Sequence, residues 1–70
     1  MNEKQRTAHF VAIILSEIKN NYMKSAEQFQ KIIENNVVVP ELVHHYGYLH
    51  MFGYDRVISE LSTKEPLLQG

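Results

Sequence analysis

Apolar residues recur at helical spacing through the first third of the chain. Successive residues of an α-helix lie about 100° apart around its axis. Six apolar side chains therefore fall within an arc of roughly 140° and form one stripe: Phe10, Val11, Ile14, Leu15, Ile18 and Tyr22. This stripe predicts a core-facing helix from about Glu3 to Asn20 or Tyr22. We expect Asn20 and Asn21 to end it, because asparagine tolerates the left-handed backbone conformation common at helix ends.

A second amphipathic segment begins at Ser25. Ser25 and Gln28 have the spacing of a capping box, in which side chains satisfy free backbone amides at the start of a helix. The apolar side of this segment is made of Ala26, Phe29, Ile32 and Ile33. We therefore expect a second helix that opens at Ser25 and ends at Asn35 or Asn36.

Three valines at positions 37 to 39 follow the second helix. β-branched residues suit a strand, but a lone three-residue strand has no partner elsewhere in this sequence. We expect an extended connector that buries its side chains. Pro40 suits the first turn of a third helix, where its missing amide hydrogen is not needed. Glu41 beside it complements the positive end of the helix dipole.

The third predicted helix runs from Pro40 to about Phe52. Its buried face carries Leu42, Tyr46 and Leu49. Gly53 is a natural stop, because glycine adopts the left-handed conformation without steric cost. Asp55 can then cap or charge the start of a fourth helix.

The fourth helix is predicted from an apolar stripe of Val57, Ile58 and Leu61. Pro66 limits its continuation. We expect residues 1–62 to form a single helical domain and residues 63–70 a C-terminal tail, in which Leu67 and Leu68 either pack back or lie loose. The predicted fold class is all-α, a compact bundle of about four short helices.

The length of the chain makes such a bundle marginally stable. A chain of 70 residues buries only about 60% of its unfolded surface. The absence of cysteine excludes disulfides, thiolate metal sites and a catalytic cysteine. Tight helix packing or association with another chain must supply the stability. Apolar residues make up 44% of the sequence, more than so short a chain hides easily.

Charged residues do not gather in one region. Seven Lys and Arg against eight Asp and Glu give a net charge of −1, without the positive surface that nucleic acids attract. Lys4 and Arg6 ahead of an apolar run resemble the start of a signal peptide. Ser16, Glu17 and Lys19 end that run too early for secretion or for a membrane span. We therefore expect a cytoplasmic protein with no membrane or nucleic-acid partner.

Three of the four histidines fall close together and suggest a metal site. Two ligands on one helix face need a separation of three or four residues, whereas His44, His45 and His50 are one, five and six residues apart. Histidines beside a buried face more often bond to backbone or tyrosine. We expect no metal and no cofactor.

The other polar residues do not form a catalytic set. Every acidic residue, from Glu3 to Glu65, is interpreted as solvated helix surface or as a cap, not as a group held in a pocket for acid–base catalysis. The serines lack the Gly-flanked turn that exposes a nucleophile, and three glycines cannot form a phosphate-binding loop. We expect no enzymatic activity.

Two short helices joined by a turn also satisfy the minimum for a helix-turn-helix motif. The start of its second helix, Glu41 to His45, offers no Arg, Lys, Asn or Gln to the edges of bases. A DNA-associated transcriptional regulator is therefore the alternative function and not the leading one.

A second stripe on the third helix carries His44, Tyr48 and Met51, opposite its buried face. Tyr and Met are enriched in protein interfaces, which makes these three residues candidates for an interface. A helix with two apolar sides can equally lie at the centre of a bundle and contact neighbours twice. Ile13 is the fourth candidate, because it lies off the apolar stripe of the first helix, among polar residues.

The residues that carry a family resemblance extend over most of the chain, from roughly Thr7 to Leu61. They are the apolar segment Phe10 to Ile18, the capped segment Ser25 to Asn36, the turn Val37 to Leu42, and above all Tyr46, Leu49-His50, Gly53 and Tyr54 to Leu61. In this order they resemble a small bacterial family catalogued as domain of unknown function 3791. Asn36 stands where that family often has glycine, and Met51 and Phe52 replace a polar Thr-Gln pair.

The resemblance implies a non-enzymatic partner in a two-gene module, sometimes beside a toxin, and it implies no catalytic residues. Together with the high apolar content, it predicts a protein–protein interaction module of unknown process. The expected partner is a second copy, as in a dimer, or the product of a neighbouring gene. An antitoxin-like role is one form of this hypothesis.

Overall fold

The structure, a computed structural model, describes residues 2–23 and 25–69. Four helices of seven residues or more form the body of the described chain: α1 (Glu3–Glu17), α2 (Ala26–Glu34), α3 (Val38–His44) and α5 (Tyr54–Ser62). One further short helix, α4 (Tyr46–Leu49), connects α3 to α5. A π-helical turn (Ile18–Tyr22) and a 3-10 turn (Pro66–Leu68) complete the described elements. The predicted all-α bundle is confirmed.

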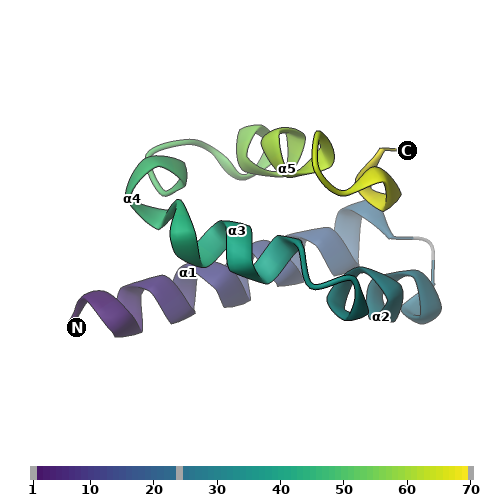
Figure 1. The fold of residues 1–70 in the computed structure, drawn as a ribbon, viewed down its shortest axis with the longest axis horizontal. Helices are drawn as coiled ribbons and strands as arrows, with labels where there is room; N and C mark the ends of the chain where they lie inside the picture. Colours follow the sequence, from purple (N-terminus) through teal and green to yellow (C-terminus); the bar gives the residue numbers. More distant parts are fainter. Residues whose placement is uncertain (1, 24, 70) are drawn as a thin grey trace.

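The first helix packs against two of the other helices. In Figure 1, α1 runs along the long axis of the molecule behind the other helices, with α3 in front of it and α5 above. α1 contacts both α3 and α5, and α2 contacts α3 and the π turn. The short α4 turns the chain back from α3 towards α5, so the last helix lies against the first.

One hydrophobic core joins every helix. Its buried residues are Phe10, Ile14, Ile18, Ile32, Val38, Leu42, Leu49, Val57, Ile58, Leu61 and Leu68. The predicted stripe of the last helix lies in this core, and so does that of the first helix as far as Ile18, because residues three or four apart share one helix face. Tyr22, the last member of the stripe predicted for the first helix, is 38% exposed and lies outside the core. Val11 and Leu15 pack against it half-buried, as the edges of the α1 stripe.

The second helix ends as its sequence predicts. Ser25 Oγ accepts a hydrogen bond of 3.2 Å from the backbone N–H of Gln28, which satisfies one of the free amides at the start of α2. At the other end, Asn36 adopts a φ of 55°, the left-handed conformation that stops a helix.

The first helix continues to Tyr22, one of its two predicted ends, but Asn20 and Asn21 do not end it. Asn20 and Asn21 do not adopt the left-handed conformation; they lie inside the π turn that continues α1. Their side-chain amides bond back by four residues, Asn20 Nδ2 to Ser16 Oγ at 3.4 Å and Asn21 Nδ2 to Glu17 Oε2 at 2.8 Å. These bonds support continued helical geometry, so the helix persists to Tyr22.

The predicted extended connector is wrong, because Val38 and Val39 form the first turn of α3. Val38 is 1% exposed and lies four residues before the buried Leu42, so both side chains reach the core from one helix face. Pro40 lies within the first turn, as expected, where no amide hydrogen is required.

The third predicted helix is broken at His45, whose φ of −110° and ψ of 20° lie outside the helical range. α3 stops before it and α4 starts after it. Tyr46 then packs edge-on against Phe10, with ring centroids 5.4 Å apart. Gly47 lies in the short α4, and its low helix propensity weakens the preference for one continuous helix through this region.

Gly53 and the C-terminal segment have roles that the sequence did not reveal. Gly53 adopts an extended conformation directly before α5, so it begins the last helix and does not end the previous one in the left-handed form. After α5, Leu68 is buried in the core and Leu67 is 41% exposed. Of the two leucines, only Leu68 therefore packs back on the core.

Candidate functional site

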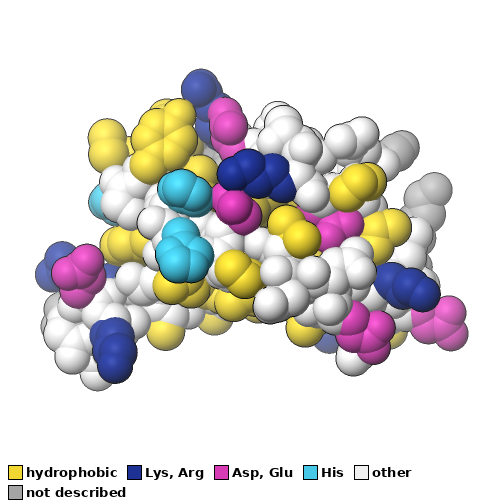
Figure 2. All heavy atoms as spheres, viewed as in Figure 1, with side chains coloured by type: hydrophobic (Ala, Val, Ile, Leu, Met, Phe, Trp, Pro, Cys, Tyr) yellow, Lys and Arg dark blue, Asp and Glu magenta, His cyan; other side chains and the backbone are white. Residues whose placement is uncertain are grey.

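Exposed apolar side chains gather around α4. Met51 is 72% exposed and Tyr48 is 54% exposed. Figure 2 shows hydrophobic side chains and histidines side by side at the left end of the molecule, over α4 and the end of α3. We call Tyr48, Met51 and the half-buried Phe52 the α4 surface.

The candidate interface residues do not share one helix. His44 is the last residue of α3, Tyr48 lies in α4, and Met51 follows α4. The continuous stripe expected for a single helix does not exist, because the backbone leaves helical geometry at His45. All three side chains are nevertheless exposed, so none of them serves as a central contact of the bundle.

Phe52 contacts two neighbouring side chains at the α4 surface. The Tyr48 ring meets it edge-on, with centroids 4.9 Å apart and planes at 76°. The Arg56 guanidinium lies 4.7 Å from the centroid of the same ring, within the range of a cation–π contact. The contacts among Tyr48, Phe52 and Arg56 were not predicted. Their spacing of four residues was the signal in the sequence.

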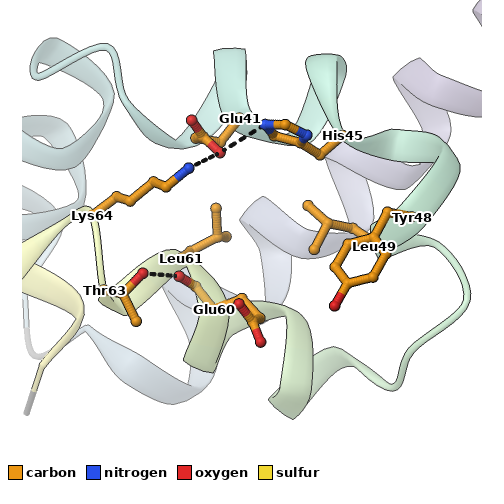
Figure 3. Close-up of a pocket in the computed structure, with 8 residues that line it drawn as sticks. All are labelled: Glu41, His45, Tyr48, Leu49, Glu60, Leu61, Thr63 and Lys64. Carbon is orange, nitrogen blue, oxygen red and sulfur yellow. Dashed lines mark hydrogen bonds and ion pairs between the residues drawn. The ribbon is translucent and has the colours of Figure 1, made fainter.

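A cleft of about 180 Å³ opens next to Tyr48 (Figure 3). Leu49 and Leu61 point into it, and Glu41, His45 and Lys64 surround its upper side. Glu41 Oε2 lies 3.0 Å from Lys64 Nζ and 3.5 Å from His45 Nε2. The carboxylate is thus already paired with neighbouring bases.

Three polar side chains of this cleft, Thr63, Glu41 and Lys64, are already bonded within the chain. The hydroxyl of Thr63 donates to the carbonyl of Glu60 at 2.7 Å and is not placed beside a base. No group of three or more His, Asp or Glu side chains in residues 2–23 and 25–69 could hold a metal ion. The arrangement ties α3 to the end of α5 by charge pairing.

The fourth candidate, Ile13, is half-buried and lines a second hollow of about 280 Å³. This hollow, which we call the Ile13 hollow, is also lined by Arg6, His9, Phe10, Tyr46, His50, Phe52 and Tyr54. Ile13 therefore faces the turn from α4 to α5 of its own chain across this hollow.

A third, larger groove of about 600 Å³ runs between α1 and α3. Its apolar lining is made of Ala8, Val11, Val39 and Val43, with Val43 49% exposed. The sequence analysis did not single out Val43. Its position off the Leu42, Tyr46 and Leu49 face was the available signal.

Comparison of the chain with protein-family models, with curated proteins and with solved structures found no match. The helices of the described residues are all too short or too polar to cross a membrane.

Proposed function

We propose that this chain is a non-enzymatic protein–protein interaction module that binds its partner through the α4 surface. The observation that carries the proposal is the 72% exposure of Met51 beside the 54% exposure of Tyr48. Methionine and tyrosine are enriched in protein interfaces. Large apolar side chains left together in water favour association.

The support beneath these side chains fits a binding role. Tyr48 is held edge-on by Phe52, and Arg56 covers the Phe52 ring, so the surface loses little conformational freedom when a partner binds. A rigid aromatic anchor beside an adaptable methionine is a combination that interfaces use.

The proposed partner is a second copy of this chain or the product of a neighbouring gene in the cytoplasm. The resemblance to domain of unknown function 3791 makes the neighbouring product the first protein to test. An antitoxin-like neutraliser is the narrower form of this proposal.

Sedimentation velocity at several concentrations, alone and after co-expression with the neighbouring product, tests the proposal. We expect the wild-type chain to associate, and the double variant Tyr48→Ala/Met51→Ala to weaken that association at least about tenfold, as loss of interface anchors does. Leu67→Ala is the matched control, because Leu67 is also an exposed apolar residue but lies in the 3-10 turn.

Two results would contradict the proposal. One is a monomer at all concentrations that does not co-purify with the neighbouring product. The other is equal weakening by the double variant and by Leu67→Ala. Binding of random DNA duplex at low salt would favour the alternative regulator function.

A further inference from the structure

Aromatic side chains line the Ile13 hollow, and three of their rings pack against one another. The Tyr46 ring packs edge-on against Phe10 at 5.4 Å and stacks on the His50 ring at 4.6 Å. Phe52 and Tyr54 complete the aromatic lining. Tyr46 and Tyr48 are two residues apart, so they project about 200° apart around α4 and serve different surfaces.

The lining of this hollow carries one cationic side chain, Arg6, and no carboxylate. His9 and His50 also line it. Both ion pairs of the described chain are made by Glu41, in the cleft beside Tyr48. Within residues 2–23 and 25–69, Arg6 therefore has no carboxylate partner, although the whole sequence carries a net charge of −1.

His50 is fixed in orientation at the edge of the hollow. Its Nδ1 lies 2.7 Å from the backbone carbonyl of Tyr46 and must donate to it, since a carbonyl oxygen only accepts. Nε2 is left without a hydrogen-bond partner among the described residues. The ring is thus fixed in place, and it lines the hollow as an aromatic surface, because Nε2 of the neutral ring is an acceptor and does not donate to a carboxylate.

We propose that the Ile13 hollow binds a carboxylate carried on a single aromatic ring. Its volume of about 280 Å³ lies just below the roughly 300–1,000 Å³ of sites for drug-sized ligands, which suits one ring. Arginine pairs with a carboxylate through two parallel hydrogen bonds, which Arg6 would supply. Tyr46 and Tyr54 meet the ring edge-on or offset. A free aromatic acid and a peptide ending in phenylalanine share this chemistry.

Amide chemical shifts of the ¹⁵N-labelled full chain, titrated with benzoate, test the proposal. We expect saturable shifts at Ile13, Tyr46 and Tyr54 with a roughly millimolar dissociation constant, the range expected for so small a ligand. Benzamide, which has the same ring without the charge, should bind at least about tenfold more weakly. N-acetylphenylalanine as a second probe distinguishes the sources: tighter binding than benzoate indicates a peptide end, and weaker binding a free acid.

Matched variants separate the charge from the ring contacts. Arg6→Gln should weaken benzoate binding about tenfold, whereas Lys4→Gln, the same loss of charge on α1 but outside the hollow, should leave it within about twofold. Tyr54→Ala should weaken binding, and Leu67→Ala should not, because Leu67 lies in the 3-10 turn and does not line the hollow. All four side chains are exposed, so folding should survive each change.

The proposal is overturned if benzoate causes no saturable shifts, if benzamide binds as well as benzoate, or if Arg6→Gln and Lys4→Gln weaken binding equally. Arg6 and Tyr54 line the hollow and are not part of the α4 surface, whereas Phe52 belongs to both. The comparison of Arg6→Gln with Lys4→Gln therefore tests the hollow by itself, and partner association through Tyr48 and Met51 can hold or fail without affecting that comparison.

Discussion

Tyr22 donates a hydrogen bond of 2.7 Å from its phenol to Asp55 Oδ1, across 33 residues of sequence. The bond joins the π turn at the end of α1 to the first turn of α5. It raises the pKa of Tyr22 above the ordinary value of 10.0, because ionisation would remove the donor. Desolvation and the negative charges of Asp55 and Glu17 add to the same effect.

This bond predicts a loss of stability at alkaline pH. A pKa raised by folding means that the contribution is complete below pH 10, where the unfolded tyrosine is still protonated, and is lost as pH rises through the folded pKa. Urea unfolding between about pH 9 and 11 should show a steeper decline for the wild type than for Tyr22→Phe. Parallel declines would show that the bond contributes nothing.

Glu65 predicts a second, larger effect on stability. Its side chain is 1% exposed, accepts hydrogen bonds from Asn35 Nδ2 at 3.2 and 3.4 Å, and accepts another from the backbone N–H of Leu67 at 3.2 Å. Glu65→Ala leaves these donors without partners and should lower the free energy of unfolding by about 1–3 kcal/mol. Urea denaturation measures it.

Glu60→Ala is the control for Glu65, since Glu60 is an exposed acidic residue on α5. It should change the free energy of unfolding by less than about 0.5 kcal/mol. Glu65→Gln, which keeps one acceptor oxygen, should fall between the two. Equal effects of Glu65→Ala and Glu60→Ala would mean that the buried hydrogen bonds are not stabilising.

The burial of Glu65 could not be predicted from the sequence. The interpretation of this residue as a cap is confirmed by its bond to Leu67, but the interpretation as solvated surface is wrong. Burial depends on Asn35, thirty residues away at the end of α2. A pattern read along one segment contains no information about such a partner.

The segments that were predicted well are those in which local signals suffice. α2 begins at a serine cap and ends at a left-handed asparagine, and both signals lie within the segment. The break at His45 and the helical start at Val38 instead follow from packing on other elements. Met51 was named as a candidate from its spacing within one segment, which left open whether it lies at an interface or at the centre of the bundle. The lining of the Ile13 hollow comes from two distant segments and could not be predicted from either one alone.

Adjacent isoleucines in α2 provide a test of the core. Ile32 is fully buried, and Ile33 is 38% exposed. Ile32→Ala should lower the free energy of unfolding by about 2–5 kcal/mol, because it removes buried methyl groups and leaves a cavity. Ile33→Ala should cost much less. If the alanine variant does not fold, Ile32→Val still allows a measurement, with an expected loss of about 0.5–1.5 kcal/mol in the free energy of unfolding.

Asn36 predicts a backbone effect that is independent of side-chain contacts. Its φ of 55° is unfavourable for residues with a branched or bulky side chain. Asn36→Val should lower the free energy of unfolding by about 1–2 kcal/mol, and Asn36→Gly should retain or raise it. Thermal unfolding compares the three. A valine variant as stable as the glycine variant would contradict the conformational argument.

Gly47 predicts a stabilising substitution. A methyl group added at this position meets no atom within 4 Å, and its φ is not positive. Gly47→Ala should therefore raise the free energy of unfolding by about 0.5–1 kcal/mol through better helix propensity in α4. A decrease in the melting temperature would show that the turn after α3 needs glycine for a reason other than space.

The π turn at Ile18–Tyr22 has a consequence for how this chain tolerates length changes. A π turn holds one more residue between bonded groups than an α turn, so it is the geometric trace of a single inserted residue. The wider turn absorbs that residue, so deleting Asn20 would convert it to ordinary α-helix and leave the residues beyond it in nearly the same direction around the axis. Tyr22 would then stay on the side of Asp55, and the core residues before the turn would keep their places. We therefore expect the first helix to tolerate the loss of one residue at this turn better than in the α-helical part before it.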